Sequence, residues 1–176
     1  MTARGALKVL LVVFVTLLVQ STIGVDISIF GVHPDLLLLL PIAAGMAGNA
    51  EEGAVMGFVA GLAADLLLPT PFGLSALVGC LVGFAVGYST GAITREVWWF
   101  PAVVALAASA VGVMLYAVMG AVLGQEQFLD LNLAALVGVV AVVNALLAAP
   151  AVRAVTWALG PASADGTRSS TAVGRW

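Results

Sequence analysis

The residue types that most often carry chemistry are few in this sequence, and they are scattered. His33 and Cys80 occur once each, and the single cysteine excludes a disulfide within the chain and a metal cluster held by several thiolates. A paired-carboxylate site would need acidic residues from separate segments to converge, at Asp26, Asp65 and Asp130. No spacing typical of a zinc protease, a phosphate-binding loop or a nucleophile with its base occurs. We therefore expect no enzymatic activity, no metal site and no cofactor.

Asp65 lies deep inside an apolar run, GAVMGFVAGLAADLLLPTPFGLSALVG at 53–79. A carboxylate in such a run is costly in a membrane and calls for an explanation. It continues a series of glycines spaced by four residues, at Gly53, Gly57 and Gly61, so it shares their helix face and points toward protein. Two interpretations stay open. The carboxylate either accepts hydrogen bonds from the start of the next helix, or it exchanges protons.

A second glycine series follows in the next apolar segment, at Gly79, Gly83 and Gly87. Glycine at every fourth position leaves a groove along one helix face, which lets another backbone approach closely in lipid. Because the two segments are neighbours along the chain, we favour packing of one against the other. The alternative is that one groove receives a helix of another protein. We also expect two buried polar residues, Gln20 and Asn144, to bridge helices.

The elements that position these residues are apolar segments, and the composition places them in a membrane. Hydrophobic residues make up 62% of the chain and charged residues 9%, whereas about a quarter of a soluble domain is charged. We therefore predict an all-α integral membrane protein with about six transmembrane helices, surrounded by lipid and without a nucleic-acid partner. The six segments are 6–23, 34–49, 52–68, 73–93, 98–123 and 131–158. The second is short for a span, so it either crosses fully or forms a re-entrant pair with the third.

The basic residues predict the orientation of the chain. If the N-terminus is cytoplasmic and six segments alternate, all Lys and Arg residues are cytoplasmic: Arg4, Lys8, Arg95, Arg153, Arg168 and Arg175. This agrees with the positive-inside rule and places both termini in the cytoplasm. We take residues 1–159 as one transmembrane domain. Residues 160–176 are small, polar and aperiodic, and we expect a disordered cytoplasmic tail there.

The motifs within residues 20–90 resemble those of a known family, the bacterial rod shape-determining protein MreD. The family pattern has Pro-Asp before an apolar helix, then G-x-x-x-G-F-x-x-G-L-x-x-D, and then G-L-x-A-L. The matching residues are Pro34 and Asp35, Gly53 to Asp65, and Gly73 to Leu77. The size of the chain and its number of apolar segments also agree, whereas the last two segments match only in hydropathy.

The resemblance implies a non-enzymatic assembly subunit of the cell-elongation machinery, which makes peptidoglycan and maintains rod shape. It implies MreC as a partner in the bacterial plasma membrane, with a RodA-type glycosyltransferase, a class B penicillin-binding transpeptidase and MreB filaments as further contacts. The glycine-lined helices, with Asp65 at their connection, would form the core or the docking surface for MreC. The implied fold is similar to the substrate-binding components of energy-coupling-factor vitamin transporters, and such a component is the alternative function.

Overall fold

The computed structural model describes residues 3–26, 35–67, 72–90, 99–124 and 133–160. All regular structure in these residues is helical, as the sequence predicts. The helices are α1 (Ala3–Asp26), α2 (Leu39–Ala47), α3 (Ala50–Asp65), α4 (Leu74–Thr90), α5 (Phe100–Val122) and α6 (Leu133–Leu159). By length and composition α1, α5 and α6 can cross a membrane, and α4 is a shorter apolar helix, so this is an all-α membrane protein. Several residues discussed above lie outside the described residues: His33, Pro34, Arg95, Asp130 and the tail from 161.

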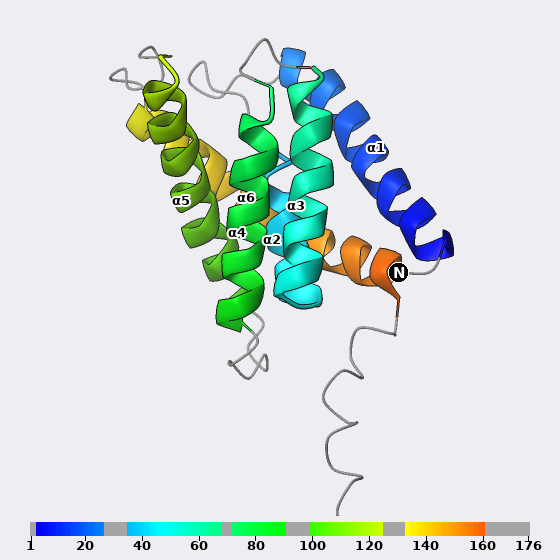
Figure 1. Cartoon of the computed structure of the whole chain (residues 1–176). Coiled ribbons are helices and arrows are strands. Elements are labelled where there is room, and N and C mark those ends of the chain that lie inside the picture. The colour runs from blue at the N-terminus through cyan, green and yellow to red at the C-terminus, as the bar shows by residue number, and fades with distance from the viewer. Residues whose placement is uncertain (1–2, 27–34, 68–71, 91–98, 125–132, 161–176) are drawn as a thin grey trace, which may run out of the picture.

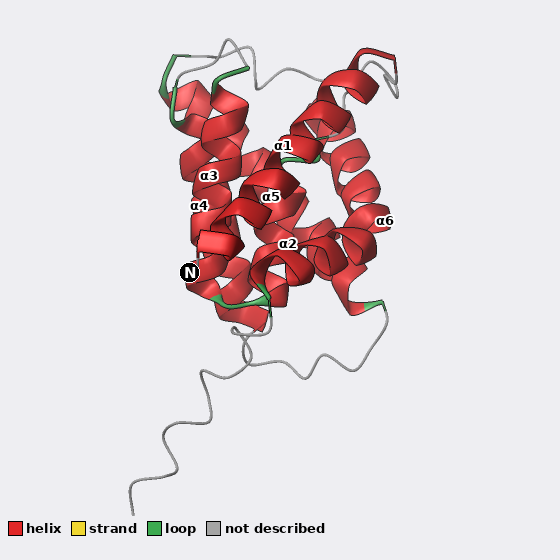
Figure 2. Ribbon diagram, turned by 90° about the vertical axis from the view of Figure 1, so that its right-hand side faces the viewer, coloured by secondary structure: helices red, strands yellow, loops and turns green. Residues whose placement is uncertain are grey.

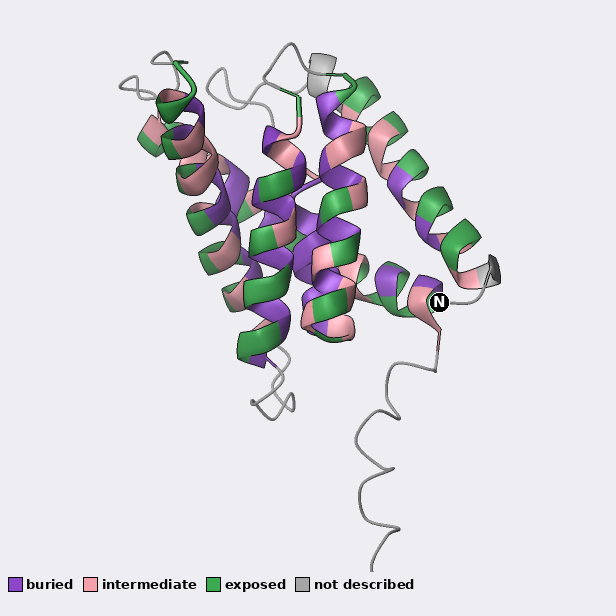
Figure 3. Ribbon diagram, viewed as in Figure 1, coloured by how far each residue is buried: buried purple, intermediate pink, exposed green. Residues whose placement is uncertain are grey.

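The helices form a bundle around α2, which is the shortest of them (Figure 1). α2 contacts α3, α4, α5 and α6, and the side chains of Ile42, Ala43 and Ala44 are fully buried. α3 packs along α4, and α5 packs along α6 (Figure 2). α1 lies at the edge of the bundle against α6 and α3, and most of its large apolar side chains are exposed (Figure 3). An apolar surface of this kind is covered by lipid in a membrane.

The second helix is shorter than the sequence predicts. We expect an apolar helix over 34–49, but α2 spans only nine residues, Leu39–Ala47. Before α2 the chain makes a turn that Asp35 caps, because one carboxylate oxygen accepts the backbone N–H groups of Leu37 and Leu38. The N–H groups of Leu39 and Leu40 still donate to the carbonyl oxygens three residues back, so the α-helix begins only at Leu39. At 1.5 Å per residue α2 is about 14 Å long, less than half of a hydrocarbon core of about 30 Å. By itself α2 is too short to cross that core.

The connection between α2 and α3 is tight, and local hydrogen bonds define both helix ends. The backbone N–H of Gly48 donates to the carbonyl oxygen of Ala44 at 2.9 Å, which closes the last turn of α2. Asn49 is the N-cap of α3, because its side-chain oxygen accepts the backbone N–H of Glu52 at 3.0 Å. Glu51 and Glu52 add negative charge to the first turn, where the helix dipole is positive. α3 therefore begins at Ala50, two residues earlier than predicted.

Candidate functional site

The two glycine series meet along one contact line, which we call the α3–α4 seam. Gly57 lies opposite Gly79, and a Cβ atom placed on Gly79 would lie 2.7 Å from the carbonyl oxygen of Gly57, closer than Cβ atoms approach in proteins. Gly53 lies in the same way against Gly83, and a Cβ atom on either would overlap the carbonyl group of the other. The seam consists of Gly53, Gly57 and Gly61 of α3 and Gly79, Gly83 and Gly87 of α4.

The close approach continues at both ends of the seam. A Cβ atom on Gly61 would overlap the backbone of Ser75, and one on Gly87 would lie 2.5 Å from the backbone nitrogen of Ala50. The glycine groove of α3 is thus filled by α4 of the same chain, which was the favoured of the two alternatives. Backbone contact of this kind is what small residues allow between helices in lipid.

Asp65 lies at the end of the seam and is only 5% exposed. Its Oδ2 accepts the backbone N–H of Gly73 at 2.8 Å and that of Ala76 at 3.3 Å, and its Oδ1 accepts the N–H of Ser75 at 3.1 Å. These groups belong to the start of α4, where N–H groups have no partner within the helix. Gly73 has a φ of +96°, a conformation that glycine adopts without strain. Because both oxygens of Asp65 are engaged, the geometry favours the capping interpretation over proton exchange.

A cavity of about 310 Å³ lies beside the seam, and all six helices or their ends contribute to its wall. Its lining includes Ala64 at the end of α3, Ser75 at the start of α4 and Leu136 at the start of α6. The cavity therefore lies toward the end of the bundle at which α3 ends and the even-numbered helices begin.

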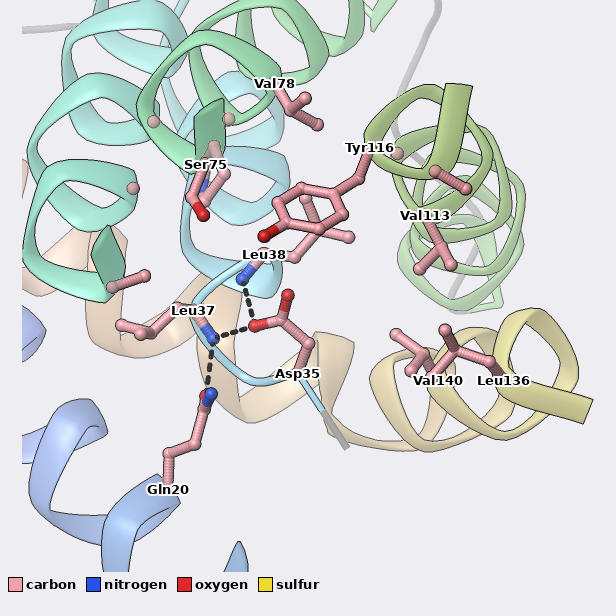
Figure 4. A pocket seen from close by; sticks show the side chains of 17 residues that line it. Gln20, Asp35, Leu37, Leu38, Ser75, Val78, Val113, Tyr116, Leu136 and Val140 are labelled. Carbon is pink, nitrogen blue, oxygen red and sulfur yellow. Dashed lines mark hydrogen bonds between the residues drawn. The ribbon is translucent and has the colours of Figure 1, made fainter. Parts of the chain in front are cut away.

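The wall of the cavity is mainly apolar, with a few polar side chains on it. These are Gln20, Asp35, Ser75 and Tyr116, shown with their apolar neighbours in Figure 4. Small ligands are usually bound in such spaces, where apolar walls supply contact area and a few polar groups fix orientation. The volume is at the lower end of the range of about 300–1,000 Å³ that is typical of ligand pockets.

The segment Asp35–Leu38, which we call the entry segment, leads into α2 and forms part of the cavity wall. Gln20 of α1 binds it, because its Oε1 accepts the backbone N–H of Leu36 at 2.9 Å and that of Leu37 at 3.0 Å. Gln20 is half-buried, so it is less enclosed than the sequence suggests, but it connects two elements as expected. This bond ties the peripheral helix α1 to the centre of the bundle.

Asn144 of α6 holds the entry segment from the opposite side. Its Nδ2 donates to the carbonyl oxygen of Asp35 at 3.1 Å and to Oγ of Ser109 in α5 at 2.9 Å. Asn144 and Ser109 are both fully buried. The bond to Asp35 fixes which end of the amide is the donor, and Oδ1 of Asn144 has no hydrogen-bond partner among the described residues. Asn144 thus joins α5, α6 and the entry segment.

The structure divides the residues singled out in the sequence into two groups. Gln20, Asp35, Gly57, Gly61 and Gly79 line the cavity. The other described ones belong to the seam, to the start of α4 or to the helix bridges away from the cavity wall: Gly53, Gly83, Gly87, Asp65, Gly73 and Asn144.

Sequence reasoning missed the cavity itself and Tyr116 on its wall. Two signals pointed toward it, the shortness of segment 34–49 and a tyrosine inside the apolar segment 98–123. Among the described residues, no three His, Cys, Asp or Glu side chains lie close enough together to hold a metal ion.

Comparison with known proteins assigns the chain to a family. A family model described as rod shape-determining protein MreD matches residues 1–128, well over half of the 176 residues. The match includes the α3–α4 seam, Asp65, the entry segment and the whole of α5, while α6 lies beyond it. No curated protein and no solved structure matches the chain. The chain therefore belongs to the MreD family of rod shape-determining proteins.

Proposed function

We propose that this chain is a non-enzymatic assembly subunit of the bacterial cell-elongation machinery, acting in the plasma membrane with MreC as its partner. Membership of a rod shape-determining family is the observation that carries the proposal. Rod shape depends on directed peptidoglycan synthesis. A RodA-type glycosyltransferase, a class B penicillin-binding transpeptidase and MreB filaments are accordingly the wider contacts that we propose.

The use of the polar side chains supports an assembly role. Asp65 caps a helix, while Gln20 and Asn144 hold the entry segment between helices. The seam is filled from within the chain, so its glycines are not free to receive a partner helix. A partner would therefore dock on an outward surface of the bundle, and the seam would serve by keeping that surface rigid.

Co-purification tests the partnership directly. The full chain carries an affinity tag, is co-expressed with MreC from the same organism and is purified from membranes in mild detergent. We expect MreC to be recovered with it, and an unrelated tagged multi-pass protein expressed at the same level to recover none. In cells, depletion of the chain should convert rods to spheres. Folded, monodisperse chain that recovers no MreC, together with rods that survive depletion, would reject the proposal.

The cavity favours a second candidate, the substrate-binding component of an energy-coupling-factor transporter. Its volume of about 310 Å³ and its mixed lining suit a small molecule. Such a component should associate with an ATPase module and should retain its substrate through purification. Mass spectrometry of the denatured preparation and of the co-purified proteins distinguishes the candidates, since an assembly subunit recovers MreC and no ATPase module.

A further inference from the structure

The carboxylate of Asp35 faces the cavity, and its described partners are all neutral. Its Oδ1 accepts the backbone N–H groups of Leu37 and Leu38, each at 3.1 Å, and the side-chain amide of Gln20 lies beside it. In Figure 4 the other oxygen carries no dashed line and points toward the side of the cavity where Tyr116 lies. The hydrogen bonds from the helix start favour a charged carboxylate, whereas burial opposes the charge, and none of the described basic side chains lies beside it as a counter-ion.

The basic side chains that the structure describes do not supply that counter-ion. They are Lys8 and Arg153, and both lie far along the bundle from Asp35. Nζ of Lys8 donates to the carbonyl oxygen of Trp157 at 3.4 Å and lies 4.6 Å from the centre of its ring, near the end of α6. Asn144, which binds the backbone of Asp35, precedes Arg153 by nine residues, or about 14 Å along the same helix.

The remaining wall of the cavity is suited to a short apolar body. Leu38, Val113, Leu136 and Val140 surround the carboxylate from three elements, and Figure 4 shows them around the same space. A charge held among apolar side chains is stable only when a partner of opposite charge or hydrogen-bond donors accompany it. The space beside Asp35 therefore favours an occupant with a positively charged end and a short apolar remainder.

We propose that the cavity binds a small amphipathic organic cation, an ammonium group on a short alkyl body, with the Asp35 carboxylate as its counter-ion. The walls from α5 and α6 enclose the alkyl part, and the ammonium group supplies a positive charge that no described side chain provides beside Asp35. This site goes beyond the assembly function proposed above and does not depend on it. Recovery of MreC tests the assembly function, and amine binding tests the cavity, so either proposal can fail without the other.

The probes are n-hexylamine and n-hexanol, which share the alkyl body and differ in charge. The full chain is purified in lipid nanodiscs, and its thermal unfolding is followed by the fluorescence of its four tryptophans at increasing ligand concentration. We expect saturable stabilisation by hexylamine with an apparent Kd at least tenfold lower than that of hexanol. Equal affinities of the two ligands for the unmodified chain would overturn the proposal.

Three variants locate the site. Asp35→Asn keeps a side-chain oxygen for the N–H groups of the entry segment but removes the charge. The apparent Kd values of hexylamine and hexanol should therefore become about equal. Asp65→Asn removes the charge of a carboxylate that does not line the cavity, and the preference should stay at least tenfold. Ala117→Phe fills the cavity from α5 and should abolish saturable binding of both ligands.

Each outcome with these variants decides the proposal. An amine preference that persists in Asp35→Asn shows that the cation binds elsewhere and overturns it. If Asp35→Asn does not fold, Ala117→Phe decides instead. Loss of saturable hexylamine binding in that variant supports the cavity, and its persistence identifies binding to lipid or to another surface and overturns the proposal.

Discussion

Asp35 and Asp65 perform the same local task in two regions that differ in packing. Each carboxylate accepts backbone N–H groups at the start of a helix, α2 for Asp35 and α4 for Asp65. Asp65 uses both oxygens on three N–H groups and is almost completely enclosed. Asp35 uses one oxygen on two N–H groups and faces a cavity. The two carboxylates thus make the same kind of hydrogen bond, but Asp65 is enclosed and Asp35 faces a cavity. The difference arises from the residues that pack around each carboxylate.

The two regions are packed by different residues. At the seam, glycines bring the α3 and α4 backbones into contact, so no space remains between them. Beside it, α2 is nine residues long, and a cavity lined in part by α5 and α6 lies at its start. We therefore expect the seam to be intolerant of added atoms and the cavity to accept them.

The largest effect should come from adding one methyl group to the seam. Gly57→Ala places a Cβ atom on the carbonyl group of Gly79, where only movement of a helix backbone can relieve the overlap. Overpacking of this kind costs about 3 kcal/mol or more of unfolding free energy. Thermal unfolding in detergent, followed by tryptophan fluorescence, measures the loss.

Gly138→Ala in α6 is the matched control, because no heavy atom lies within 4 Å of the position of its Cβ atom. It should be neutral or stabilising by about 1 kcal/mol, since alanine favours a helix over glycine. Equal stability of the two variants would show that the seam is not in backbone contact.

A smaller effect should follow from removal of the Asp65 cap. Asp65→Leu leaves three N–H groups at the start of α4 without their acceptor and should cost about 2 kcal/mol. Asp65→Asn keeps one accepting oxygen and should cost about 1 kcal/mol while largely preserving rod shape in a complementation assay. Complete loss of function in the Asn variant, with the protein folded, would instead support the charged or proton-exchanging interpretation.

The smallest effect should come from the open region. Gln20→Leu removes an acceptor for the N–H groups of Leu36 and Leu37, but Asp35 still accepts the second of these. We expect a loss of about 1 kcal/mol or less, measured in the same unfolding assay. Gln20→Glu, which keeps an accepting oxygen, is the control and should retain that hydrogen bond. A loss as large as that of Gly57→Ala would show that the cavity region is as tightly constrained as the seam.

The parts of the fold that were predicted are those set by spacing along one segment. Glycines at every fourth position define one helix face independently of the rest of the chain. The seam, and the position of Asp65 one turn after Gly61, could therefore be predicted from the sequence. The free N–H groups at the next helix start made a capping partner for Asp65 a local expectation. The start of α2 was misplaced because hydropathy does not show the turn before it, in which Asp35 accepts the N–H of Leu37 and Leu39 donates three residues back.

By itself, the sequence determined a helical membrane protein with two glycine-lined helices and a carboxylate at their connection, because composition and periodicity act within each segment. Only the tertiary structure decided that α4 fills the groove of α3, that α2 is enclosed by four other helices, and that Asp35 faces a cavity. These features depend on the relative depth and tilt of helices that are far apart along the chain. The hydropathy of a segment is the same whether its groove is filled by a neighbouring helix or left open. Only the packing of the helices distinguishes the two arrangements.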